Sequence, residues 1–276
     1  MATILFTRAL RHGKAEHATL YKNLVGMLVL GAAATLLGGE LGGAGDPADL
    51  PWLLGSGACG LAVGDWLYFV ALAHIGVGRT LILTQITPVL TALAAWPVLG
   101  ETLSAGQWAG AILVVGGGVL AESRRLERRP SDAVGLLAAL GASLAWTAGN
   151  LSLHWGLDQT PAVTGAAWRL VGGNAGILVI LALRGRGRPA LRALVLPQTH
   201  RLFLLPALLG TALGMGLLSA GFKWAMQGVA SALAAAVPVI TIPLAVLVLG
   251  ERPGWRGWSG AAVVVAGVAL MGLSLG

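Results

Sequence analysis

Few residues of this 276-residue chain can carry proton or ligand chemistry, and several lie inside long apolar segments. Asp65 is a carboxylate within such a segment, and Tyr68 follows three residues later, on the same face of a helix. If that segment crosses a membrane, the charge costs about 2.5–3.5 kcal/mol and faces an interior cavity or a partner. We predict a substrate or proton site at these two residues. The alternative is a structural carboxylate that neighbouring hydroxyl groups and glycine backbones satisfy.

A polar and aromatic stripe follows one face of the segment 133–155. Its members recur at three- and four-residue steps, which places them on one side of a helix: Ser143, Trp146, Asn150 and His154. Amide, hydroxyl and indole groups bind small molecules that are partly polar and partly apolar. We predict that the stripe lines a substrate cavity. The alternatives are hydrogen bonds between helices and, for His154 near the helix end, a position at the membrane interface.

A second polar patch lies just before a proline. Thr84 and Gln85 precede Pro88, which removes one backbone donor and frees the carbonyl of Thr84. Pro238 sits in a similar apolar setting later in the chain. We predict that the patch belongs to the cavity and that both prolines kink their helices. Each kink is either a hinge beside the cavity or a feature of packing.

The remaining reactive side chains are expected to be structural. Gly100–Glu101 and Gly250–Glu251 lie where apolar segments end and loops begin, so we predict that each glutamate caps the helix that follows or forms the turn before it, with a coupling-ion site as the alternative. The single cysteine, Cys59, is expected to be a packing residue. The sequence has no HExxH, paired-cysteine, GxSxG or phosphate-loop motif, so we predict no catalytic residue, no metal site and no cofactor.

These residues belong to a chain that cannot cover a water-facing surface. Its composition is 56% apolar and only 11% charged, with a mean hydropathy of +0.81, whereas a soluble domain carries about 25% charged residues. The apolar runs have the length of membrane helices, about 20 residues, and not of β-barrel strands. We therefore predict an all-α, polytopic helical membrane protein. Nine spans are expected, at 20–39, 51–74, 78–99, 105–122, 133–155, 162–183, 202–223, 228–249 and 255–275.

The loops between these spans differ sharply in charge. Nine spans put 16 of the 18 basic residues on one side, including Lys22 in the N-terminal segment and the loops at 124–129 and 184–192. Basic loops stay in the cytoplasm. We predict a protein of the inner (cytoplasmic) membrane with these loops in the cytoplasm and the C-terminus outside or in the periplasm. Arg169 and Lys223 are the two exceptions, and we expect them to reach toward the nearer membrane surface.

The chain repeats itself at a shift of 150 residues. Residues 78–120 and 228–270 are identical at 17 of 43 positions without a gap, and these include Pro88/Pro238 and Glu101/Glu251. A repeat unit of five helices makes consecutive copies face opposite ways, as in many secondary transporters. We predict two inverted repeats of five helices, at 1–122 and 130–276. The first repeat lacks a counterpart of the helix at 133–150. We expect either a truncated start or a nine-span variant. A groove at the place of the missing helix would indicate truncation, and a closed surface would indicate the nine-span variant.

One long stretch carries a family resemblance: GDWLYFVALAHIGVGRTLILTQITPVLTALAAWPVLGETLSAGQWAGAILVVGGGVL (64–120), with its second copy up to residue 270. It resembles the EamA family of the drug/metabolite transporter superfamily, whose halves show a mid-helix proline, a Gly-Glu pair and a glycine-rich helix. The resemblance implies a ten-helix carrier of small metabolites, often an exporter.

These features together predict a secondary active transporter, an exporter or permease of small organic metabolites that works by alternating access. The expected partners are a small-molecule substrate and the lipid bilayer, with protons as the candidate coupling ion, a homodimer as a candidate assembly and no nucleic acid. Two alternatives stay open. One is a non-transporting or truncated membrane scaffold, and the other is a membrane-embedded enzyme, although the chain offers only isolated acids and histidines.

Overall fold

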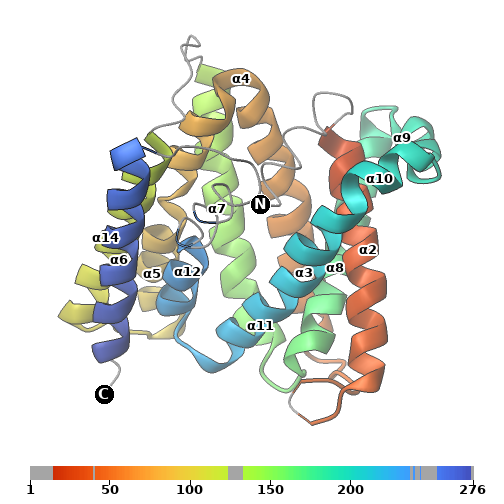
Figure 1. Cartoon of the computed structure of the whole chain (residues 1–276). Helices are drawn as coiled ribbons and strands as arrows, with labels where there is room; N and C mark the ends of the chain where they lie inside the picture. The colour runs from red at the N-terminus through yellow and green to blue at the C-terminus, as the bar shows by residue number, and fades with distance from the viewer. Residues whose placement is uncertain are drawn as a thin grey trace. The chain divides into compact units, whose positions relative to one another are not determined.

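The computed structural model describes residues 15–39, 41–123, 133–236, 239, 243 and 254–274. This part of the chain is built from helices and contains no strand (Figure 1). Eight of its helical segments are long and apolar enough to cross a membrane. Helices suit such segments because every backbone N–H and C=O is paired within the segment itself. The chain is therefore the all-α, polytopic membrane protein that its composition predicts.

Eight of the nine predicted spans are confirmed, with ends that differ by a few residues. They lie at Thr19–Leu36, Leu50–Gly76, Gly78–Leu99, Ala105–Glu122, Ala133–Gly156, Ala162–Leu183, Phe203–Trp224 and Gly254–Leu273. Gly76 separates the second span from the third, because its φ of 77° and ψ of 172° interrupt helix α4 (Asp65–Thr84). The other predicted span, 228–249, lies mostly outside the described residues, and its first part forms α12 (Gln227–Ala235).

The helices form two compact units. Unit 1 comprises Met1–Trp66 and Ala148–Trp224, and unit 2 comprises Leu67–Thr147 and Ala225–Gly276. Each unit thus combines segments from both predicted repeats. The helices α4 and α7 (Ala133–Gly156) contribute residues to both units. The boundaries of the repeats themselves stay a prediction, and residues 1–14, which include the predicted remnant of the missing helix, lie outside the described residues.

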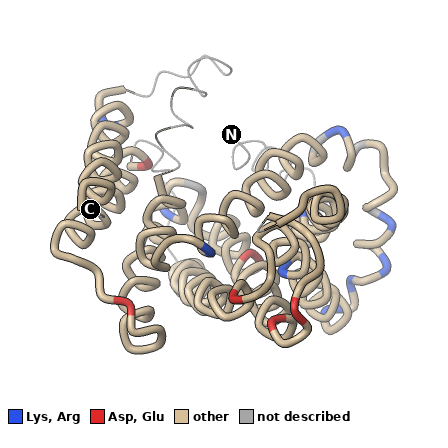
Figure 2. The backbone as a smooth tube through the Cα atoms, turned by 90° about the horizontal axis from the view of Figure 1, so that it is seen from below, with Lys and Arg blue, Asp and Glu red and all other residues tan. Residues whose placement is uncertain are grey.

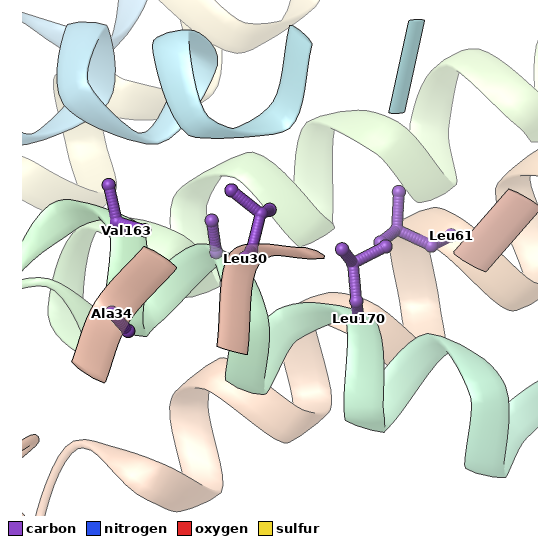
Figure 3. Close-up of a cluster of buried hydrophobic side chains, with 6 residues drawn as sticks. Leu30, Ala34, Leu61, Val163 and Leu170 are labelled. Atoms are coloured by element: carbon purple, nitrogen blue, oxygen red, sulfur yellow. The ribbon is translucent and has the colours of Figure 1, made fainter. Parts of the chain in front are cut away.

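Unit 1 packs two long helices against two spans that contain π-helical turns. Its elements are α2 (Ala15–Leu36), α3 (Leu50–Ser56), η1 (Gly57–Gly64), the end of α7, α8 (Ala162–Leu183), α9 (Gly187–Leu194), α10 (Pro197–Pro206), η3 (Ala207–Leu213) and α11 (Gly214–Trp224). A buried apolar cluster joins α2, η1 and α8 (Figure 3). It contains Leu30, Ala34, Leu61, Val163, Ala166 and Leu170.

The contacts within unit 1 are reciprocal at the shift of 150 residues. The π-helical segments η1 and η3 begin at Gly57 and Ala207, which are 150 positions apart. Helix α2 packs on η3, and α8, which lies at the matching place in the second copy, packs on η1. Helices α2 and α8 also pack on each other. A two-fold axis between inverted copies would produce this pattern, although the inverted repeat itself stays a prediction.

Unit 2 contains most of α4, the first part of α7, α5 (Thr87–Leu99), α6 (Ala105–Glu122), α12 and α14 (Gly254–Leu273). Helices α6 and α14 lie side by side and antiparallel (Figure 1). Glycines allow their backbones to touch: a Cβ built on Gly110 would lie 2.7 Å from the carbonyl oxygen of Gly267, and one on Gly117 would lie 2.7 Å from that of Gly260. Small residues at such crossings let membrane helices approach closely.

Candidate functional site

A charge cluster built around Asp65 lies among the membrane-spanning helices of unit 1. Lys22 Nζ donates a hydrogen bond of 2.6 Å to Asp65 Oδ2, and the two side chains are only 10% and 13% exposed. Lys22 also donates to the Oδ1 atom of Asn23, at 3.0 Å. Lys22 and Asn23 come from α2, whereas Asp65 begins α4 directly after the π-helical segment η1. Helices α2 and η1 both pack on α8, and this arrangement brings the two charges together.

A second cation, Arg169, lies in the same unit and is 2% exposed. Its Nη2 atom donates to Asn150 Oδ1 at 3.1 Å. Its Nε and Nη1 atoms have no hydrogen-bond partner among the described residues. The charge of Asp65 acts favourably on this guanidinium. Two buried cations of unit 1, Lys22 and Arg169, therefore lie in the field of the Asp65 carboxylate.

Glycines enclose Arg169. A Cβ added to Gly57 would collide with the backbone carbonyl of Arg169, and one on Gly60 would lie 3.2 Å from its Nη2 atom. On the other side, a Cβ on Gly149 would lie 3.0 Å from the Cα of Gly60. The helices η1, α7 and α8 can approach this closely only because these positions lack side chains. The guanidinium is therefore held in a narrow space, with little freedom to leave it.

Two further buried amides near these helices have unused hydrogen-bonding atoms. Asn23 Nδ2 and Asn174 Oδ1 lack partners among the described residues. Asn174 Nδ2 donates to the carbonyl of Leu170 at 3.0 Å and lies 3.8 Å from the sulfur of Met27. Unpaired buried polar atoms are costly, and each asks for an explanation such as a water or a ligand. The cluster is therefore polar enough to receive a small polar group.

The structure overturns two of our expectations about the basic residues. Lys22 does not belong to a loop: it lies inside α2, and its buried ammonium forms an ion pair. Arg169 does not reach toward the membrane surface, because neighbouring glycines admit its side chain to the interior of unit 1. The depth argument that selected Asp65 applies equally to Arg169, which sits eight residues into the span Ala162–Leu183. The same argument could therefore have identified Arg169 from the sequence.

The predicted cavity residues fall in both units. Asp65, Asn150 and His154 belong to unit 1; Tyr68, Thr84, Gln85, Ser143 and Trp146 belong to unit 2. Within unit 2, the rings of Tyr68 and Trp146 lie 5.3 Å apart. Ser143 is fully buried and donates to the carbonyl of Ala139 in its own helix, at 3.2 Å. Gln85 lies beside Gly118, where an added Cβ would collide with its amide.

Pro88 lies at a helix start and not in the middle of a helix. Helix α4 ends at Thr84, and α5 begins at Thr87, so Pro88 occupies the first turn, where a missing N–H is tolerated. The carbonyl of Thr84 accepts instead from the hydroxyl of Thr87, at 2.8 Å. Thr84 itself donates to the carbonyl of Thr80 at 2.9 Å. The sequence placed the irregularity correctly, and it consists of two turn residues, Gln85 and Ile86, between α4 and α5 within the span Gly78–Leu99. Pro238 lies outside the described residues.

Glu101 caps a different helix from the one we expected. Its Oε2 atom accepts from the backbone N–H of Gln227, the first residue of α12, at 2.7 Å. The following helix, α6, is capped by Ser104 and Gln107, which bond each other's backbone N–H groups. Gly100 ends α5 with a φ of 72°. Gly250 and Glu251 lie outside the described residues.

His154 and Lys223 lie at the opposite end of unit 1 from its arginine-rich segment. His154 is exposed at the end of α7 and lines a cavity of about 610 Å³. Lys223 is held by backbone carbonyls: its Nζ atom donates to those of Leu157 and Thr160, at 2.7 and 3.1 Å. These bonds give Lys223 a role in fixing the turn after α7, and its reach toward the nearer membrane surface stays a prediction.

Arginines gather along the segment from the end of α8 to α10, where Figure 2 shows basic residues in blue. They are Arg184, Arg186, Arg188, Arg192 and Arg201. The short helix α9 lies in this segment, and its Ala190 is fully buried. Among the described residues, no group of three or more His, Cys, Asp or Glu side chains could hold a metal ion. The charge cluster of this unit is held by ion pairing and hydrogen bonding.

Comparison with known proteins adds the family context. The sequence profile of the EamA-like transporter family matches residues 1–122 and 133–273. A protein of Streptantibioticus cattleyicolor described as "Probable terminal-alkyne amino-acid exporter" is 28% identical over 270 residues, which cover 95% of this chain and 87% of that protein. A protein of known crystal structure, 20% identical, has a TM-score of 0.74 over 99% of this chain and 95% of its own. That likeness supports the fold alone.

Proposed function

This chain belongs to the EamA-like transporter family, and we propose that it is a secondary active exporter of a small organic amine, driven by protons through alternating access. The family supports a membrane transporter with a small-molecule substrate. The exporter described for the relative favours outward transport of an amino acid-like solute. We further propose the cytoplasmic membrane as its location, a homodimer as its assembly, and roles in substrate binding for the polar residues of α7 and of the patch before Pro88.

The observation that carries this proposal is the ion pair of Lys22 and Asp65 inside the membrane-spanning helices of unit 1. Charges at this depth are expensive, so they are usually found where ions or substrates bind or move. Asp65 is the carboxylate of the cluster, and it can hold one cation closely at a time. A proton, the ammonium of Lys22 and the ammonium of a substrate therefore compete for the same oxygens.

That competition provides the coupling. When a substrate ammonium displaces Lys22 from Asp65, the site is loaded for export. When a proton binds Asp65, the carboxylate loses its charge and its attraction for the ammonium, so the substrate leaves. A carboxylate that binds either ligand but not both exchanges one proton for one substrate. An inward proton gradient then drives the substrate outward.

Proteoliposomes with a defined pH gradient test the proposal. Uptake of a labelled amino acid into inside-out vesicles, acidified within, should rise several-fold over vesicles without a gradient. Asp65→Asn should abolish this dependence on the gradient while the protein still inserts and elutes as a single species. Asp46→Asn, in an exposed loop of the same unit, is the matched control and should transport normally. Gradient-driven transport by Asp65→Asn at the wild-type rate would contradict the proposal and show that Asp65 has a structural role only.

A further inference from the structure

A cavity of about 610 Å³ opens within unit 1, away from the charge cluster. Its wall is formed by the end of α7 and the turn after it, by the start of α3 and by the end of α11. Its aromatic and charged or polar lining residues include Trp52, His154, Trp155, Asp158, Lys223 and Trp224. Its volume falls within the range of about 300–1,000 Å³ that small-molecule sites occupy.

The aromatic groups of this cavity are arranged to receive an ammonium group and an apolar side chain. The rings of Trp52 and Trp155 lie 4.8 Å apart, tilted by 41°. Trp52 and Trp224 are 47% and 54% exposed, so they present ring surface to a ligand. Indole faces attract cations through their negative quadrupole, and the same faces cover apolar groups. A ligand with an amine beside a hydrocarbon group matches both properties.

The charges of the cavity have opposite signs and remain apart. Asp158 is exposed, and its carboxylate accepts from the amide of Gln159 at 3.3 Å. Lys223 donates its hydrogen bonds to backbone carbonyls, including that of Asp158. Among the described residues, no carboxylate lies within 4.0 Å of its ammonium group. Asp49, the other acid of the wall, is occupied by the backbone and hydroxyl of Thr160. One exposed carboxylate, and one cation that has no ion-pair partner among the described residues, thus line the same cavity.

We infer that this cavity binds a zwitterionic α-amino acid with an apolar side chain. The ammonium of the ligand binds Asp158 and the indole faces, its carboxylate lies in the field of Lys223, and its side chain rests on Trp155. On the predicted topology the cavity opens to the outer side of the membrane, so it is a release site for the exported molecule. This role rests on the proposed function, whereas the binding itself does not require transport.

Tryptophan fluorescence of the purified full-length protein in phosphatidylglycerol nanodiscs measures the binding directly. L-leucine should give a saturable change, whereas N-acetyl-L-leucine, which lacks the ammonium, should give none. Asp158→Asn should weaken leucine binding about tenfold or more, the effect of losing a charge-assisted hydrogen bond. Asp158→Glu should retain it. Trp255→Ala removes an exposed tryptophan from the other unit and should leave the dissociation constant unchanged.

The outcomes separate this inference from the proposed function. Absence of leucine binding by the wild type, equal binding of N-acetyl-L-leucine, or an unchanged affinity in Asp158→Asn would each overturn it, even if proton-driven export is found. Leucine binding without any transport would support the site and contradict the exporter. Phosphatidylethanolamine also carries an ammonium. A fluorescence change on exchanging the lipids, without a response to leucine in either, would assign the cavity to a lipid headgroup and overturn the proposal.

Discussion

Lys22 and Asp65 are 43 positions apart in the sequence, yet their side chains form an ion pair of 2.6 Å inside unit 1. Neither helix needs the other charge in order to form. The pair exists because α2 and η1, the segment that leads into α4, both pack on α8, and each charge lowers the cost of burying the other. Removing one member should therefore be worse for the protein than removing both.

We expect Lys22→Met to lower the free energy of unfolding by about 3 kcal/mol, because it leaves the carboxylate buried without its partner. The double variant Lys22→Met/Asp65→Asn should recover much of this loss. Unfolding by SDS, followed by tryptophan fluorescence, measures both. Arg256→Met removes an exposed cation from α14 and serves as the control. Additive losses in the double variant would contradict the coupling of the two side chains.

Arg169 and Asn150 provide a second test of the cluster. Asn150→Ala should destabilise the protein by about 1–3 kcal/mol, because it leaves the Nη2 atom of a fully buried guanidinium without an acceptor. Asn150→Asp should be more stable than Asn150→Ala, since it supplies both an acceptor and a counter-charge. Thermal unfolding in detergent compares the two variants. If Asn150→Asp melts at or below Asn150→Ala, Arg169 does not depend on an acceptor at this position.

The contact between α6 and α14 depends on glycine at particular positions of one helix. Gly117→Ala should cost about 1–3 kcal/mol, because the new methyl group would lie 2.7 Å from the carbonyl oxygen of Gly260 and the backbones must separate. Its neighbour Gly116 has nothing within 4 Å of an added Cβ. Gly116→Ala should therefore change stability by less than about 0.5 kcal/mol. Equal losses in the two variants would show that helix propensity, and not the contact, is being measured.

The charge of the loops predicts how the protein sits in the membrane. In a Cys59→Ser background, Gln159→Cys should react with an impermeant maleimide from outside the cell, whereas Arg188→Cys should react only after permeabilisation. Phosphatase fused after Gly276 should be active in the periplasm. A fusion that is active only as a cytoplasmic reporter, or labelling of position 188 in intact cells, would reverse the predicted orientation.

Much of the architecture could be predicted from the sequence, because insertion of a helix depends on the composition of that segment alone. The segments 105–122 and 162–183 were predicted with the boundaries that the structure has. The glycine at position 100 likewise marked a helix end, since it acts through its own backbone geometry, whereas Pro88 was expected to kink a helix and instead lies in the first turn of α5.

The partners of the buried polar groups were decided by packing. Composition alone placed Lys22 in a loop and Arg169 at the surface, because it does not show which helices meet or where glycines open a space between them. Glu101 caps α12, a helix that begins 126 residues later, and this depends on how α12 lies against the end of α5. The sequence by itself thus determined which segments enter the membrane, since transfer into lipid is a sum over about 20 neighbouring residues. Only the tertiary structure decided which charges meet there. An ion pair joins two helices that are far apart in the sequence, and no local sequence pattern shows that they lie close together in space.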